Sequence, residues 1–67
     1  MRFVQQTTYG DWEFFLGHLN DTYYCIVRKN GVKEAQTLLQ FADDDSACRW
    51  HSEFVHECLV QIECGAM

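Results

Sequence analysis

The chain has 67 residues, and its ten Asp and Glu residues outnumber five Lys and Arg residues, which makes the net charge −5. A chain of this length forms one small domain, residues 1–67, with little room for a deep substrate cleft, so we expect no enzyme. The charge argues against direct binding to nucleic acid, because most of that affinity comes from Lys and Arg contacts to phosphates, and against anionic membranes.

The composition is that of a folded protein, with 48% hydrophobic and 15% aromatic residues. No segment has the length and apolarity of a membrane span, and the N-terminus turns polar too early for a signal peptide. We therefore expect a cytoplasmic protein with its cysteines as free thiols.

Three turn signals about ten residues apart divide the first forty residues into four segments. They are Gly10-Asp11, Asn20-Asp21 and Asn30-Gly31. Asn-Gly is the strongest of these signals, because both central residues of a type I′ turn adopt positive φ. Since β-branched and aromatic residues fill the intervening segments, the sequence predicts an antiparallel β-meander of about four strands.

Beyond Phe41 the apolar residues recur at the three- and four-residue spacing of a helix face. These residues are Ala47, Cys48, His51, Phe54, Val55, Cys58 and Leu59. The pattern predicts a helix over about 44–58, with Leu59–Glu63 as a short fifth strand and Cys64–Met67 as a fraying end. The expected fold class is α+β, a meander packed on one helix.

One helix covers one face of such a sheet and leaves the other open. Alternation along the strands places four apolar residues on the open face, fringed by three charged ones: Phe15, Tyr24, Ile26 and Leu38, with Glu13, Arg28 and Glu34. An apolar patch rimmed by charge is a candidate partner or dimer surface. The alternative is that the N-terminal strand or the C-terminal segment folds over it.

Acidic residues gather at the start and on the outer side of the predicted helix. Asp43, Asp44 and Asp45 form the only charge run, and Glu53 and Glu57 continue it. Capping of the helix N-terminus explains one aspartate but not three. The stripe is therefore either a binding surface for a cationic partner or a solvated face, on which an arginine pairs with Glu53.

The cysteines and histidines allow a metal site, but packing is the favoured interpretation. Cys48 and His51 lie one helical turn apart, whereas Cys58 is too far along the helix to share an ion with them. His51 lies on the apolar face, where we expect a buried histidine with its hydrogen bonds satisfied. Trp50, at the border of that face, is expected to pack on the sheet edge rather than to anchor an interface.

In size, acidity and layout the whole chain resembles small phage-encoded anti-CRISPR proteins. The run from Phe41 to Trp50, which joins the meander to the helix, is part of this layout. The chain is most similar to type I inhibitors, including those of type I-C systems. The resemblance implies a non-enzymatic DNA mimic whose carboxylates occupy a basic groove on a Cas subunit and keep DNA out.

The leading hypothesis is accordingly an inhibitor, without cofactor or metal, that binds a basic nucleic-acid-binding protein. The residues expected to bind this partner are Asp43, Asp44, Asp45, Glu53, Glu57, Glu13 and Glu34. The alternative is a dimeric interaction module that uses the apolar sheet face, and a third hypothesis is a metal- or redox-responsive protein. The protein would be a monomer in the first case and a homodimer in the second.

Overall fold

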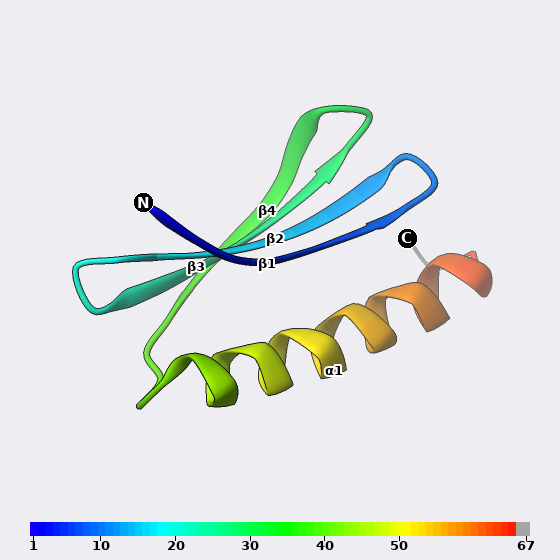
Figure 1. The fold of residues 1–67 in the computed structure, drawn as a ribbon. Helices are drawn as coiled ribbons and strands as arrows, with labels where there is room; N and C mark the ends of the chain where they lie inside the picture. The colour runs from blue at the N-terminus through cyan, green and yellow to red at the C-terminus, as the bar shows by residue number, and fades with distance from the viewer. Residues whose placement is uncertain (66–67) are drawn as a thin grey trace.

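The computed structural model describes residues 1–65, which form one four-stranded antiparallel sheet and one helix (Figure 1). The elements are β1 (Arg2–Tyr9), β2 (Trp12–Leu19), β3 (Thr22–Lys29), β4 (Val32–Leu39) and α1 (Asp44–Glu63). Each strand pairs with the next one in the chain, in the order β1-β2-β3-β4. The predicted α+β meander on a single helix is confirmed.

The three hairpins turn at the positions that the sequence predicts. Asn20 and Asp21 have φ of 51° and 64°, and Asn30 and Gly31 have φ of 54° and 79°. Two consecutive positive φ values are what a type I′ turn requires, and its twist matches that of the strands. In the first hairpin Gly10 has φ of 57°. Short hairpins of this kind fix the register of all four strands.

The helix runs past its predicted end. The prediction of a fifth strand over Leu59–Glu63 is wrong, because this segment is the last part of α1. Leu59 and Ile62 continue the apolar side of the helix and pack against the core. As part of the helix, Leu59 and Ile62 remove apolar surface from water against a core that is already formed.

The helix ends with ordinary capping bonds. The backbone N–H of Cys64 donates to the carbonyl of Val60 at 3.0 Å, and that of Gly65 donates to Ile62 at 3.1 Å. The expectation of a fraying end concerns Cys64–Met67, and the last two of these residues lie outside the described ones.

The core lies between α1 and one face of β1, β2 and β3. It consists of two clusters, Leu16, Tyr23, Cys25 and Ala47 near the start of the helix, and Phe14, Val27, Val55 and Cys58 further along. Trp50 packs at the border as expected, with its ring stacked on Phe54 at 5.1 Å and tilted against Phe41 at 5.9 Å. The alternation predicted for β2 and β3 is confirmed, because their helix-facing residues are buried.

The fourth strand lies beyond the reach of the helix. Every residue of β4 is exposed except Leu39, which is half-buried. A bulge also interrupts its pairing, since Val27 lies opposite Ala35 whereas Arg28 lies opposite Lys33. The residue left between them is Glu34. A bulge shifts the alternation by one residue, so the prediction that Glu34 lies on the open face with Leu38 is wrong, and Glu34 lines a groove towards α1.

In the described part of the chain the helix is too polar to cross a bilayer as a membrane span.

We expect Phe14→Ala to lower the free energy of unfolding by about 3–5 kcal/mol, because Phe14 is fully buried and the surrounding side chains fill its cavity only partly. Guanidinium unfolding followed by circular dichroism measures this loss. Phe3→Ala is the matched control, since Phe3 is 58% exposed, and it should cost less than about 1 kcal/mol. Equal losses of stability in the two variants would mean that the helix does not pack on the sheet face that carries Phe14.

Candidate functional site

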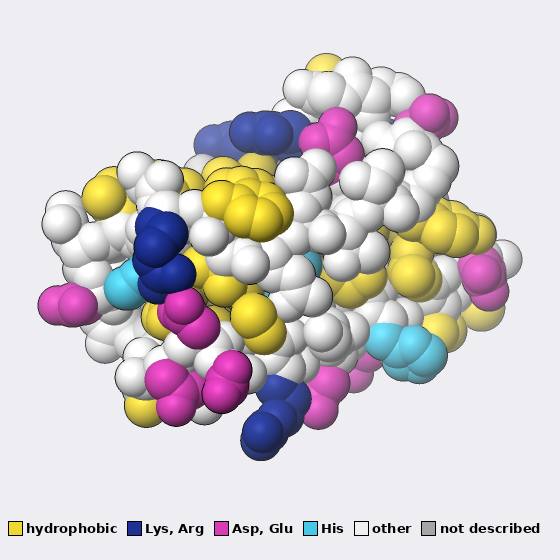
Figure 2. Space-filling view, viewed as in Figure 1, with side chains coloured by type: hydrophobic (Ala, Val, Ile, Leu, Met, Phe, Trp, Pro, Cys, Tyr) yellow, Lys and Arg dark blue, Asp and Glu magenta, His cyan; other side chains and the backbone are white. Residues whose placement is uncertain are grey.

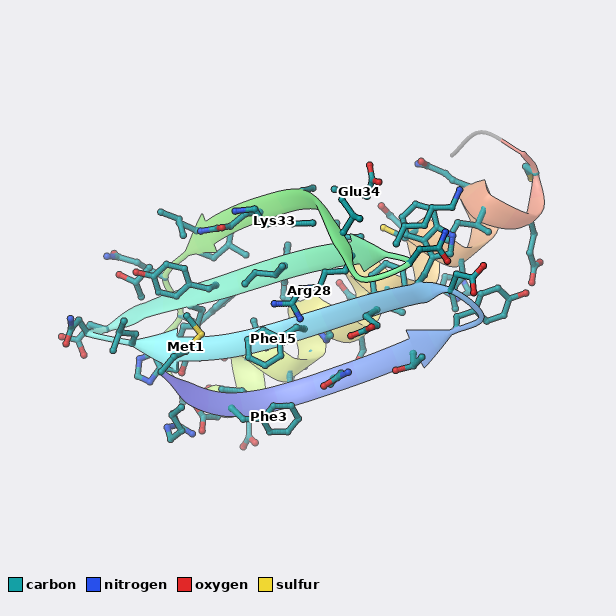
Figure 3. The ribbon with its side chains drawn as sticks, turned by 90° about the horizontal axis from the view of Figure 1, so that it is seen from above. Met1, Phe3, Phe15, Arg28, Lys33 and Glu34 are labelled. Atoms are coloured by element: carbon teal, nitrogen blue, oxygen red, sulfur yellow. The ribbon has the colours of Figure 1, made fainter. Side chains whose placement is uncertain are left out.

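The sheet face opposite the helix carries an uncovered apolar patch (Figure 3). Phe15, Tyr24 and Ile26 are half-buried there, whereas Phe3 and Leu38 are each 58% exposed. Because β1 pairs beside β2 and α1 lies on the other side (Figure 1), neither β1 nor α1 folds over this face. The alternative in which the N-terminal strand covers the patch is therefore wrong.

Two residues that the sequence argument left out belong to this patch. The ring of Phe3 lies 5.7 Å from the ring of Phe15. Gly17 faces the same side, and a side chain in its place would collide with Met1 and Phe15. A glycine in a central strand therefore makes room for Met1 on the open face. Alternation alone would have placed Phe3 on the helix side with Gln5, which lies opposite the buried Leu16, because a bulge between Phe3 and Gln5 shifts the register of β1.

Charged residues lie at one end of the open face. Glu13 is opposite Arg28 across β2 and β3, and Arg28 is opposite Lys33 across β3 and β4. None of these three residues forms an ion pair with another. The ion pair within residues 1–65 joins Arg2 to Asp44. Glu13 thus lies opposite a cation of its own sheet and does not extend the acidic surface of the helix.

Asp43 caps the helix. Its side chain accepts a hydrogen bond from the backbone N–H of Ser46 at 2.8 Å, and its backbone is extended, with φ of −156°. This hydrogen bond lowers the pKa of the Asp43 carboxyl, since the charged form is the better acceptor. Its first task is structural, as the capping interpretation predicts.

Asp44 ties the start of the helix to the sheet. Its carboxylate accepts two hydrogen bonds from the Arg2 guanidinium, at 2.8 and 2.9 Å, and one from the Tyr23 hydroxyl at 2.7 Å. Arg2 also donates to Nδ1 of His18 at 3.0 Å, and the ring of His18 stacks on Tyr23 at 4.3 Å. These bonds, from Arg2 first and Tyr23 second, hold the pKa of Asp44 well below its usual range.

Asp44 is thus occupied within the molecule, and sequence reasoning missed this network. Its partners stand 42 and 21 positions away in the chain. No local pattern signals a contact between the first strand and the helix start. Of the three aspartates, only Asp45 has neither a capping hydrogen bond nor an ion pair among the described residues.

The outer side of α1 carries the remaining free acids. Asp45, Glu53 and Glu57 are exposed and form no ion pair within residues 1–65. Arg49 is exposed between them, and the predicted pairing of this arginine with Glu53 is not formed. Figure 2 shows acidic side chains over the helix with a basic one among them. We call Asp45, Glu53 and Glu57 the acidic helix face.

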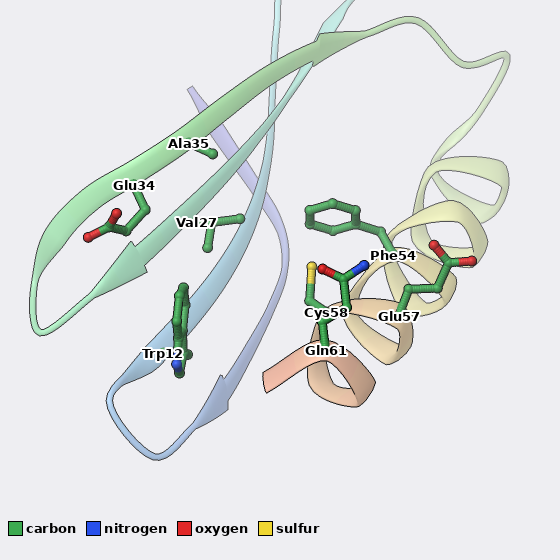
Figure 4. A pocket seen from close by; sticks show the side chains of 8 residues that line it. All are labelled: Trp12, Val27, Glu34, Ala35, Phe54, Glu57, Cys58 and Gln61. Carbon is green, nitrogen blue, oxygen red and sulfur yellow. The ribbon is translucent and has the colours of Figure 1, made fainter. Parts of the chain in front are cut away.

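A groove of about 490 Å³ opens between β4 and the helix, where β4 projects past its cover (Figure 4). Its apolar lining comes from Trp12, Val27, Ala35, Phe54 and Cys58, and its polar lining from Glu34, Glu57 and Gln61. The groove therefore joins two residues of the predicted site, Glu34 from the sheet and Glu57 from the helix, over an apolar floor.

His51 is fully buried, but neither of its ring nitrogens has a hydrogen-bond partner among the described residues. The prediction that His51 is buried is confirmed, whereas the prediction that its hydrogen bonds are satisfied is wrong. Burial lowers the pKa of His51, because the charged ring loses its hydration. Burial likewise raises the pKa of Cys25 to about 11, which keeps this thiol protonated and inert.

The cysteines form no metal centre in the described part of the chain. Cys25 and Cys58 are buried, Cys48 is half-buried and Cys64 is exposed, all as free thiols. No three Cys, His, Asp or Glu side chains within residues 1–65 come close enough together to hold an ion.

No protein-family model, curated protein or solved structure matches this chain.

Asp44→Asn should lower the stability of the fold more than Asp45→Asn, although both remove one negative charge. The first change weakens three hydrogen bonds to Arg2 and Tyr23, whereas the second removes none. Thermal unfolding at neutral pH compares them. Because its folded pKa is lowered, Asp44 contributes stability above the unfolded pKa near 4, and the contribution is lost as the pH falls further. Equal midpoints would contradict the anchoring role.

Acidification should destabilise the protein through His51. Its pKa is lowered in the folded state, so below pH of about 6.5 the unfolded chain binds a proton that the folded chain does not. The contribution of neutral His51 to the free energy of unfolding is therefore fully present above this pH. It falls by up to about 1 kcal/mol by pH 5.5. Guanidinium unfolding at both pH values measures the difference.

His51→Leu should remove this loss, whereas the control His56→Gln should keep it, since His56 is exposed. A loss of the same size in His51→Leu would assign the pH dependence to other groups.

Proposed function

We propose that this protein is a non-enzymatic inhibitor that binds a basic nucleic-acid-binding protein and prevents that protein from binding DNA. The observation that carries the proposal is the acidic helix face. Asp45, Glu53 and Glu57 are exposed on one helix and are not neutralised by ion pairs among the described residues. The resemblance to type I anti-CRISPR inhibitors makes a Cas subunit the first partner to test.

Fewer residues are proposed to bind the partner than the sequence alone predicts. Asp43 caps the helix, Asp44 anchors it to the sheet, and Glu13 lies opposite Arg28 of its own sheet. The surface that remains for a partner is Asp45, Glu53 and Glu57 on the helix, with Glu34 at the β4 edge. The 20-residue helix fixes the backbone positions of Asp45, Glu53 and Glu57, so binding does not have to order the backbone that carries them.

The physical mechanism is competition for cationic side chains. Lys and Arg residues that contact DNA phosphates are attracted by a fixed row of carboxylates in the same way. Because both partners then carry opposite net charges, association should be fast and sensitive to salt. The bound inhibitor occupies the surface that DNA needs.

A second candidate function is supported by the open sheet face. An apolar patch that includes Phe3 and Leu38, each 58% exposed, is the kind of surface that a second copy or another protein covers. A sedimentation measurement separates the two candidates. A tight dimer broken by Ile26→Asp favours this second function, and a monomer favours the first.

The first proposal predicts that Asp45→Asn/Glu53→Gln weakens binding to the basic partner by about fivefold or more. The measurement uses a purified type I Cas effector complex with labelled target DNA, to which the protein is added at about 50 mM and about 300 mM salt. Wild-type protein should displace DNA at low salt and much less at high salt.

Asp11→Asn/Asp21→Asn is the matched control, because it removes the same charge from two exposed hairpin turns. It should displace DNA as the wild type does. Equal activity of the helix variant and the wild type, or displacement that salt does not change, would contradict the electrostatic mechanism. Capture from a host lysate under the same two salt conditions extends the test to partners other than Cas complexes.

A further inference from the structure

We propose that the groove between β4 and α1 binds an extended basic segment of a partner, one that places an arginine or lysine beside an apolar residue. This inference deepens the proposed function and rests on it for the identity of the partner. The groove has about 490 Å³, which is more than one side chain fills and is within the range of ligand sites.

The floor of the groove favours apolar atoms. Val27 and Cys58 are buried core residues that line the groove. Phe54 and Trp12 also line it and are half-buried. Ala35 leaves the space open, because it is exposed and has the smallest side chain that a strand residue can carry short of glycine. An aliphatic side chain in this space would remove apolar surface from water on both partners.

The rim of the groove favours a positive charge. Glu34 comes from the bulge in β4 and Glu57 from the helix, and these two residues line the groove from opposite sides (Figure 4). Neither has an ion-pair partner within residues 1–65. An arginine or lysine has the matching shape, since its aliphatic stem packs on the apolar floor while its cationic head reaches a carboxylate.

The indole of Trp12 shows that this end of the sheet already attracts a cation. Lys29 lies over the Trp12 ring, with Nζ 5.3 Å from the ring centroid. The groove lining includes Trp12 but not Lys29. The indole edge, the two carboxylates and the apolar floor are therefore left to a ligand that is both cationic and apolar.

The edge position of β4 gives an extended segment access to the groove. All residues from Val32 to Leu38 are exposed on both faces, and no strand pairs with the outer edge of β4 in the described sheet. A segment that enters from this edge does not have to displace α1. The basic residue and its apolar neighbour then reach the groove without unfolding any element.

A capped peptide of alternating arginine and leucine is the probe for this proposal. It should bind to the protein with a fluorescence change of Trp12, measured in a Trp50→Phe background so that Trp12 is the remaining tryptophan. A glutamate–leucine peptide and an arginine–serine peptide should each bind at least about tenfold more weakly, because the first repels the carboxylates and the second lacks apolar side chains.

Two variants block the groove in different ways. Ala35→Phe fills it without changing the charge, and Glu34→Gln/Glu57→Gln neutralises its rim; each should weaken peptide binding about tenfold or more. Thr37→Phe is the control for the first, since Thr37 is exposed on the same face of β4 but does not line the groove. Circular dichroism verifies that all variants are folded.

Unchanged binding to Ala35→Phe, or equal affinity for the three peptides, would overturn the proposal. A concentration-dependent mass together with no peptide binding would also overturn it, because a second copy would then occupy the groove. Failure of the proposed function is a separate result. In that case Asp45→Asn/Glu53→Gln, whose residues lie outside the groove, displaces DNA as the wild type does while Ala35→Phe still loses the peptide.

Discussion

The width of one helix determines what this small domain leaves uncovered. Four strands about 4.8 Å apart span roughly 15 Å, whereas a helix with its side chains is about 10–12 Å wide. The helix therefore covers β1 to β3 on one face, and β4 is exposed except at Leu39. The groove beside β4 follows from this limited width. The apolar patch around Phe15 is open because the helix packs on the opposite face, against Phe14 and Leu16. Residues 1–65 contain no second helix that could cover these surfaces.

The ten acidic residues do not act as one group. Asp43 caps the helix, and Asp44 joins it to Arg2 of the first strand and Tyr23 of the third. These contacts lie at the helix start, where the positive end of the helix dipole also stabilises carboxylates. Further along the helix, Glu63 accepts a hydrogen bond from Tyr9 at 3.5 Å. Asp45, Glu53 and Glu57 are exposed and form no ion pair within residues 1–65, so they are available to solvent or to a cationic protein.

Features with a short-range cause were predictable from the sequence. The turn residues Asn30 and Gly31, the alternation of β2 and β3 and the buried side of α1 each depend on neighbours a few positions away. Contacts between distant residues were not predictable, such as the pairing of Arg2 with Asp44. The bulge at Glu34 also escaped prediction, because its residues have no turn signature. The unsatisfied nitrogens of His51 became visible only with its surroundings.

The central claim is that one helix leaves β4 and the open face accessible in solution. Relaxation of methyl NMR signals by a dissolved paramagnetic agent tests it directly, because the effect falls steeply with distance from solvent. We predict strong broadening for Leu38 and Ala35, and little for Leu16 and Val55, which are at most 5% exposed. Protection of Leu38 equal to that of Leu16 would contradict the account, since another surface would then cover the sheet.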